Sequence, residues 1–163
     1  MGKELREEKK VRAYLDTCVY NRPFDDQSDI RIFLEARVVY GILKMIEEEK
    51  IVSINSDALE YEITLIPDAE RKLRIKTYLD LAKEYIELSD TIIKRANEII
   101  TLGIRDMDAL HLAIAEEVKV DYFLTCDDDI INKVKRAQRM LKVRVCGVLE
   151  FAQEIFYAFE NSK

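Results

Sequence analysis

The feature that most constrains this chain is a segment, residues 104–130, in which acidic residues flank an apolar helix and an apolar strand. Asp106 and Asp108 stand at the start of the run DALHLAIA, and three aspartates, residues 127–129, follow the run YFLT. Carboxylates repel one another, and burying them without partners is costly. A divalent cation bound by oxygen ligands relieves that repulsion. The segment therefore predicts a metal site built at the ends of buried elements.

Short apolar runs alternate along the chain with longer segments of helical periodicity. Strands are predicted at residues 11–16, 51–55, 85–88, 122–125 and 142–146. Helices are predicted at residues 30–49, 57–66, 69–82, 90–102, 107–118, 129–141 and 149–159, and residues 17–28 are predicted to be a loop. Alternating strands and helices indicate an α/β fold, a three-layer α/β/α sandwich around a parallel sheet of about five strands.

Length and composition indicate one globular domain. The chain has 163 residues, of which 48% are hydrophobic and 36% charged, which is enough for a single core under a charged surface. We expect residues 1–10 to be a charged tail and residues 11–163 to be the domain. The tail lacks the apolar segment of a signal peptide, and no run reaches the roughly 18 apolar residues of a membrane span. A cytoplasmic location with no membrane partner is therefore expected.

The cysteine and histidine content argues against a structural zinc site. Cys18, Cys126 and Cys146 form no CxxC pair, and His111 is the only histidine. We interpret the cysteines as small buried residues in a reducing compartment. His111 lies three residues after Asp108, near the same helical face. A packed histidine with a local hydrogen bond is the simpler interpretation of it, and a general acid is the other.

Acids from four separated segments are expected to meet at one edge of the sheet, because open α/β sheets bind ligands at the carboxyl ends of their strands. The catalytic candidates are Asp16, Glu60, Asp108 and Asp127, and the metal-binding candidates are Asp16, Asp108, Asp127 and Asp129. Such oxygen ligands suit Mg²⁺ or Mn²⁺. One or two of these ions can polarise a phosphodiester and activate a water. The acids therefore predict a metal-dependent nuclease that needs no nucleophilic side chain.

Other charged residues have plainer interpretations. Asp106 and Asp128 are expected to cap the helices that follow them. The net charge of −6 argues against broad, non-specific binding to a nucleic-acid backbone, although clustered carboxylates would contribute much of that excess. A basic run near the C-terminus is either a phosphate-contacting face or a solvated helix face. It comprises Lys133, Lys135, Arg136, Arg139, Lys142 and Arg144.

Taken together, four stretches of the chain resemble the PIN-domain family, which includes the VapC-like and PilT N-terminus-type ribonucleases. The resemblance covers residues 11–148. YLDTCVYNRPFDD resembles the opening strand with the first acid at Asp16, SDALEYEI supplies a second acid at Glu60, and RDMDALHLAIA supplies a third at Asp108. FLTCDDDI resembles the T-x-D-x-D element, with Thr125, Asp127 and Asp129. The NRPFDD loop is closer to an uncharacterised prokaryotic subgroup than to the typical toxins.

The resemblance implies Mg²⁺- or Mn²⁺-dependent cleavage of single-stranded RNA, with the Thr125 hydroxyl positioning the metal cluster. It also implies a homodimer and, where a member acts as a toxin, an antitoxin protein as partner. The alternative is a non-catalytic PIN-fold module that binds RNA or acts as a scaffold. A phosphoacceptor receiver domain is disfavoured because Asp16 has no adjacent acid. A nucleotide-binding Rossmann domain is disfavoured because no Gly-rich loop follows the first strand.

Overall fold

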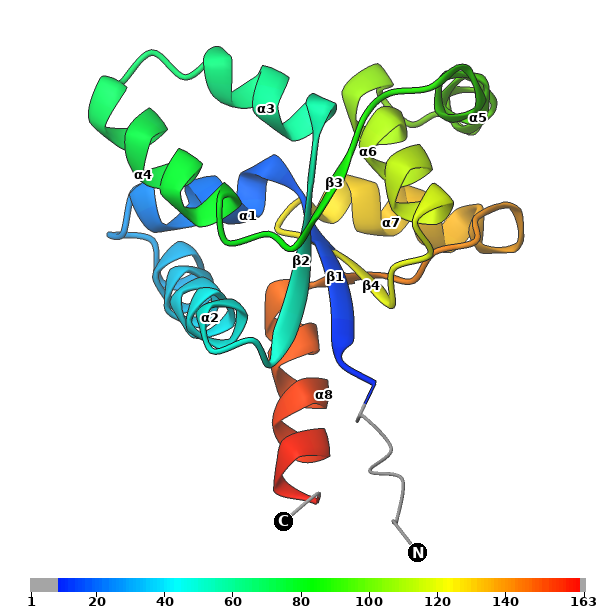
Figure 1. Cartoon of the computed structure of the whole chain (residues 1–163). Helices are drawn as coiled ribbons and strands as arrows, with labels where there is room; N and C mark the ends of the chain where they lie inside the picture. Colours follow the sequence, from blue (N-terminus) through cyan, green and yellow to red (C-terminus); the bar gives the residue numbers. More distant parts are fainter. Residues whose placement is uncertain (1–8, 162–163) are drawn as a thin grey trace, which may run out of the picture.

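The fold is built on one parallel sheet. The structure, a computed structural model, describes residues 9–161, so most of the expected N-terminal tail lies outside the described residues. The five strands are arranged in the order β3-β2-β1-β4-β5 (Figure 1). They are β1 (Val11–Leu15), β2 (Ile51–Ser56), β3 (Glu84–Ile86), β4 (Tyr122–Thr125) and β5 (Val145–Gly147). The predicted α/β class and parallel sheet are confirmed.

Helices cover both faces of the sheet and complete the three layers. They are α1 (Thr17–Asn21), α2 (Ile30–Glu47), α3 (Asp57–Thr64), α4 (Ala69–Leu79), α5 (Asp90–Ile100), α6 (Asp106–Glu117), α7 (Asp128–Arg136) and α8 (Val148–Glu160), with short 3-10 turns at Arg22–Phe24 and Gln138–Met140. Helices α2 and α8 pack together on one face, and α5 packs on α6 on the other (Figure 1).

The central position of β1 decides where the site forms. Ala13 pairs with Ser53 of β2 on one side and with Tyr122 of β4 on the other. Because all three strands are parallel, β1 and β4 end at the same edge of the sheet. The backbone N–H of Asp16, just past the end of β1, donates to the Leu124 carbonyl at 2.9 Å. The residues that follow these two strands are therefore held side by side.

Helix α6 explains why residues 104–130 are so apolar. Five of its side chains, Ala109, Leu112, Ala113, Ile114 and Ala115, are at most 1% exposed. The helix is enclosed by the sheet and by α5, and a helix buried on nearly all sides needs apolar residues all round. Each fully buried Leu or Ile contributes about 1.5–3 kcal/mol to folding. This packing anchors α6 firmly at the edge where Asp108 stands.

Several segment boundaries differ from the sequence predictions, and three of the differences have a local explanation. The predicted loop at residues 17–28 begins with the short helix α1, because the Asp16 side chain accepts the Thr17 N–H and caps it. The helix predicted at residues 129–141 ends at Arg136, and its last turns are replaced by the 3-10 turn at Gln138–Met140. The last strand begins later than predicted, because pairing to β4 places Val145 opposite Phe123.

No helix within residues 9–161 combines the length and the apolar composition that crossing a membrane requires.

Candidate metal centre

Asp16 is a nearly buried carboxylate at the end of β1, with 5% of its surface exposed. Its Oδ1 accepts the Thr17 N–H at 2.8 Å, and its Oδ2 accepts the Thr125 hydroxyl at 3.0 Å and the Cys18 thiol at 3.2 Å. Burial raises the pKa of Asp16 well above its ordinary value, and the charge of nearby Asp108 adds to the effect. All three donors are neutral, and no lysine or arginine within residues 9–161 forms an ion pair with this carboxylate.

Thr125 joins the two strand ends. While its hydroxyl donates to Asp16, its oxygen accepts the Asp127 N–H at 3.1 Å. Asp127 in turn caps α7, since its side chain accepts the N–H of Asp129 at 2.9 Å. The fully buried Thr125 therefore fixes the backbone that carries Asp127 relative to the carboxylate of Asp16.

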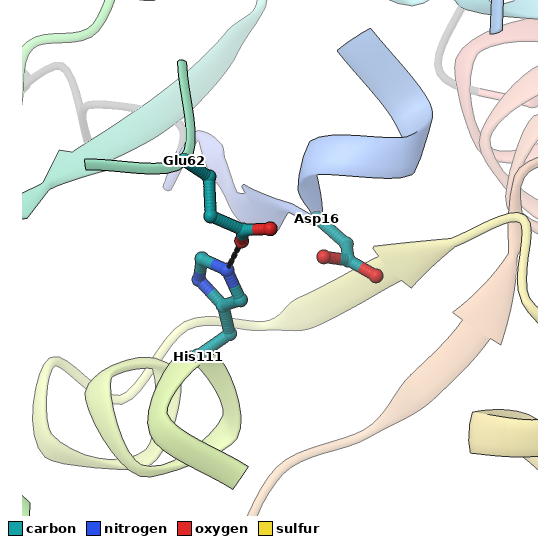
Figure 2. A group of neighbouring side chains, drawn as sticks. All are labelled: Asp16, Glu62 and His111. Atoms are coloured by element: carbon teal, nitrogen blue, oxygen red, sulfur yellow. Dashed lines mark hydrogen bonds and ion pairs between the residues drawn. The ribbon is translucent and has the colours of Figure 1, made fainter. Parts of the chain in front are cut away.

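Glu62, on α3, is the second acid that the structure brings to Asp16. Oxygen or nitrogen atoms of Asp16, Glu62 and His111 all lie within 4.8 Å of one another (Figure 2). Glu62 Oε1 accepts the Thr17 hydroxyl at 2.8 Å and is also hydrogen-bonded to His111 Nε2. Burial alone would raise the pKa of Glu62, but the hydrogen bonds from His111 and Thr17 lower it below its ordinary value. Glu62 is thus held ionised.

His111 is fully buried and has a partner at each ring nitrogen. Nδ1 lies 2.6 Å from the Tyr14 hydroxyl, which lies 2.8 Å from Ser56 Oγ. Ser56 Oγ also accepts the Leu59 N–H as the N-cap of α3, which leaves its hydroxyl free to donate to Tyr14. Tyr14 then donates to Nδ1, and Nε2 carries the proton that faces Glu62. With donation in this direction, every polar side-chain atom in the series of hydrogen bonds from Ser56 to Glu62 has a partner.

Because both of its nitrogens are engaged, His111 orients Glu62 rather than offering a free ligand atom. The interpretation of His111 as a packed histidine with hydrogen bonds agrees with this arrangement. Burial also keeps the pKa of Tyr14 well above its ordinary value, so its hydroxyl stays neutral and can donate. A neutral, fully bonded network of this kind fixes its members in one geometry.

Glu60, the expected second acid, is placed differently. Its Oε1 accepts hydrogen bonds from Asn55 Nδ2 at 2.8 Å and from Lys76 Nζ at 2.5 Å, and it is not part of the group formed with Asp16. At about 100° per residue, two positions along a helix point roughly 200° apart. Glu62 falls within the buried arc of α3, with Ala58 and Leu59, whereas Glu60 falls outside it. A helical wheel would have indicated this difference.

Asp108, in the first turn of α6, is half-buried and faces the same group. Burial raises its pKa, and the neighbouring carboxylates of Asp127 and Glu62 raise it further. Asp106 is also a first-turn residue and does not cap the helix as predicted: Arg105 holds the N-cap position, and no side chain caps that end. Of the two acids at this helix start, Asp108 is therefore the one surrounded by other carboxylates.

The last two aspartates of the acidic triplet have cationic partners. Asp129 is exposed and forms an ion pair with Lys133 at 2.8 Å. Asp128 is not the N-cap as expected, because Asp127 has that role, and it forms a two-bond ion pair with Arg31 of α2. By contrast, among residues 9–161 no lysine or arginine forms an ion pair with Asp16, Asp108 or Asp127. Asp108 thus interacts with the negative charges of both Asp16 and Asp127, and no ion pair to a lysine or arginine offsets them in this part of the chain. Of these three acids, only Asp16 belongs to the close group with Glu62 and His111.

Cys18 is a contributor that the sequence argument missed. All three cysteines are free thiols, and Cys126 and Cys146 are buried as expected. The Cys18 thiol, however, donates to Asp16 and accepts the Cys126 N–H at 3.3 Å. Its position two residues after Asp16, in the helix that Asp16 caps, is the signal that could have revealed this contact.

The donor set fits a hard divalent ion. Asp16, Asp108, Asp127 and Glu62 offer carboxylate oxygens, two of them with raised pKa values because the negative charges are crowded and desolvated. Mg²⁺ and Mn²⁺ prefer such oxygen ligands. The thiol of Cys18 is protonated and bonded to Asp16, and burial together with its contacts to Cys126 raises its pKa. It is therefore poorly suited to a soft metal.

Comparison with known proteins shows likeness of fold. No protein-family model matches the chain, and no curated protein matches its sequence. The crystal structure of VapBC2 from Rickettsia felis bound to a DNA fragment from their promoter is similar, with a TM-score of 0.56 and 16% sequence identity. The match covers 84% of this chain and 98% of that one. The chain therefore has a PIN-like α/β/α fold.

Proposed function

We propose that the chain is a Mg²⁺- or Mn²⁺-dependent ribonuclease that cleaves phosphodiester bonds of single-stranded RNA. The observation that carries this proposal is that side-chain oxygens of Asp16 and Glu62 lie within 4.8 Å of each other, with the charge of Asp108 nearby and no lysine or arginine ion pair to these acids among the described residues. A purely structural cluster of acids needs basic partners, since unpaired buried charge is costly. A bound divalent cation would supply the missing positive charge.

Each residue has a distinct role in this proposal. Asp16, Glu62, Asp108 and Asp127 would hold the metal, which when bound polarises the phosphodiester and activates a water. Glu62 takes the place that sequence reasoning gave to Glu60. Thr125 positions Asp16 and Asp127 relative to each other through its hydroxyl.

Asp129 is a weaker candidate ligand than the four principal acids. Its carboxylate is exposed and paired with Lys133, and hydrogen bonding to that lysine lowers its pKa. Binding a metal would require that ion pair to open. Lys133 would then be free to contact a phosphate of the RNA, which is one of the two interpretations of the basic run.

The solved neighbour suggests partners. That structure holds VapBC2 with promoter DNA. By analogy we propose that this chain forms a homodimer and binds an antitoxin protein, with toxin activity as its biological role. Copurification of a small protein with the chain from its native host, lost when ionic strength is raised, would test the antitoxin part.

The function is tested by incubating the purified protein with a labelled single-stranded RNA in Mg²⁺, in Mn²⁺ and in EDTA. We expect cleavage in either ion, none in EDTA, and loss of cleavage in Asp16→Asn and Asp108→Asn. Glu87→Gln, on the exposed surface after β3, is the matched control and should cleave normally. Equal cleavage by all variants would contradict the assignment. Folded protein that binds no Mn²⁺ at millimolar concentration by calorimetry would favour the non-catalytic RNA-binding or scaffold module.

A further inference from the structure

A cavity of about 390 Å³ opens beside the metal centre, between α1, α3 and the start of α4. Thr17 and Glu62 form part of its wall. Both also belong to the candidate metal centre, where the Thr17 hydroxyl donates to Glu62 Oε1 and the Thr17 N–H donates to Asp16. A molecule in the cavity would therefore touch Glu62, one of the carboxylates proposed to hold the metal.

One wall of the cavity is apolar. It is formed by Leu65, Ile66 and Pro67, at the turn between α3 and α4. Leu65 is a large apolar side chain with 62% of its surface exposed, although Ile66 beside it is buried. Small-molecule sites are typically 300–1,000 Å³ and are apolar with a few fixed polar groups. The volume of the cavity and its apolar wall suit one planar ring system.

The opposite rim is polar and rigid. Arg71 Nε donates to Asn21 Oδ1 at 2.9 Å, and its Nη2 donates to Asp25 Oδ1 at 3.0 Å. Its guanidinium also lies 5.6 Å from the centre of the Phe24 ring. Asn21 Nδ2 donates to the Thr17 carbonyl at 3.0 Å, so the amide is fixed as well. The NRPFDD segment thus holds Arg71 in place at the edge of the cavity.

The charge balance favours a neutral ligand. Arg71 is paired with Asp25, and its backbone N–H is bonded to the carboxylate of Asp68, which also lines the cavity. Glu62 contributes a further negative charge on the side of the metal centre. The guanidinium therefore offers hydrogen-bond donors without an excess of positive charge. A phosphate group would be repelled here, whereas a nucleobase would be accommodated.

We propose that this cavity, the base pocket, binds the nucleobase of a nucleotide next to the scissile phosphate. The proposal rests on the proposed ribonuclease function and adds to it a subsite for the substrate. The face of the base lies on Leu65 and Pro67, and its polar edge meets Arg71. The attached phosphate then reaches the metal centre past Thr17 and Glu62. The base pocket thereby places the RNA strand on the α1–α3 side of the site.

The test uses probes that contain no phosphodiester to cleave. The four common ribonucleoside 5′-monophosphates and inorganic phosphate are titrated by calorimetry into the full-length protein in Mg²⁺. In wild type, the best mononucleotide should bind at least tenfold more tightly than phosphate. Leu65→Asp should abolish that advantage. Leu73→Asp, an equally exposed leucine on α4 outside the cavity, should retain it.

The outcomes separate this proposal from the proposed function. If mononucleotides bind no better than phosphate, or if the two leucine variants behave alike, the base pocket is wrong even when RNA is cleaved. If the Leu65-dependent binding is present but no RNA is cleaved in Mg²⁺ or Mn²⁺, the base pocket stands and the ribonuclease assignment fails. When cleavage is present, sequencing of the cut ends should show a base preference in wild type that Leu65→Asp loses and Leu73→Asp keeps.

Discussion

The two sides of the candidate metal centre are built differently. On the α3 side, Asp16 and Glu62 are held by buried neutral donors, including the Tyr14–His111 chain. On the α7 side, Asp129 is exposed and bound to Lys133, while Asp127 is half-buried and caps the helix. A carboxylate fixed by neutral donors keeps its charge available to a cation. The α3 side is therefore preorganised, whereas on the α7 side Asp129 would have to release Lys133 before it could bind a metal.

The largest expected difference is in RNA cleavage, between substitutions of two glutamates on α3, Glu62 and Glu60. Glu62→Gln removes a charge from the preorganised side, and we expect RNA cleavage to fall by about 100-fold or more, since even outer-shell changes cost 10–100-fold. Glu60→Gln removes only an ion pair to Lys76, which is worth about 0–1 kcal/mol, and cleavage should be unchanged. Initial rates of cleavage of the same labelled RNA by the two variants test both expectations. If Glu60→Gln were the more damaging change, the placement of Glu62 in the site would be refuted.

An intermediate effect should come from the residue that orients Glu62. His111→Leu removes the Nε2–H donor, and we expect Mn²⁺ affinity to weaken by about 10–100-fold, the range seen for partners of metal ligands. His111→Gln can still donate to Glu62 and should recover most of that affinity. Calorimetry with Mn²⁺ measures this independently of cleavage. If both variants lost affinity equally while remaining folded, His111 would have only a packing role.

The smallest effect should be on thermal stability, and it has a defined sign. A carboxyl whose pKa is raised by folding binds more protons in the native state, so stability falls as pH rises from about 4 towards the raised pKa. Asp16 is such a group. Each unit of elevation corresponds to about 1.4 kcal/mol, or roughly 3–6 °C in Tm for a chain of this size. In EDTA, the Tm of Asp16→Asn should fall less with rising pH than the Tm of wild type does. At pH 7 we expect the Tm of Asp16→Asn to be the higher of the two.

Mn²⁺ should counteract this loss of thermal stability with rising pH, because the ion binds only the ionised carboxylates. Its stabilisation of wild type should therefore grow as pH rises, and it should be much smaller in Asp16→Asn. Melting curves with and without Mn²⁺ at several pH values test this. A wild-type Tm in EDTA that rises across that pH range would show that Asp16 is not a strained, desolvated acid.

The sequence predicted the sheet and the strand-end acids because both follow from local patterns. Asp16 and Asp127 come directly after buried apolar runs, and parallel strands end at one edge. Glu62 was not predicted because only its position around α3, within the arc of Ala58 and Leu59, distinguishes it from Glu60, and its neighbours in sequence do not. The network through Tyr14 could not be predicted, since Tyr14 and His111 are 97 residues apart and no local pattern pairs one with the other. The α1 helix was not predicted because the turn residues at its end and beyond, from Asn21 to Asp26, indicated a loop.

The bond between Asp16 and Thr125 spans 109 residues of sequence. Contacts between residues so far apart form slowly, because the loop between them must close first. On the ribosome, β1 emerges long before β4. Asp16 is therefore made early, whereas Thr125 and Asp127 are made late. A growing chain thus cannot assemble the complete carboxylate group until residue 127 has left the exit tunnel. If the chain cleaves RNA as proposed, the order of synthesis delays that activity until nearly the whole protein has been made.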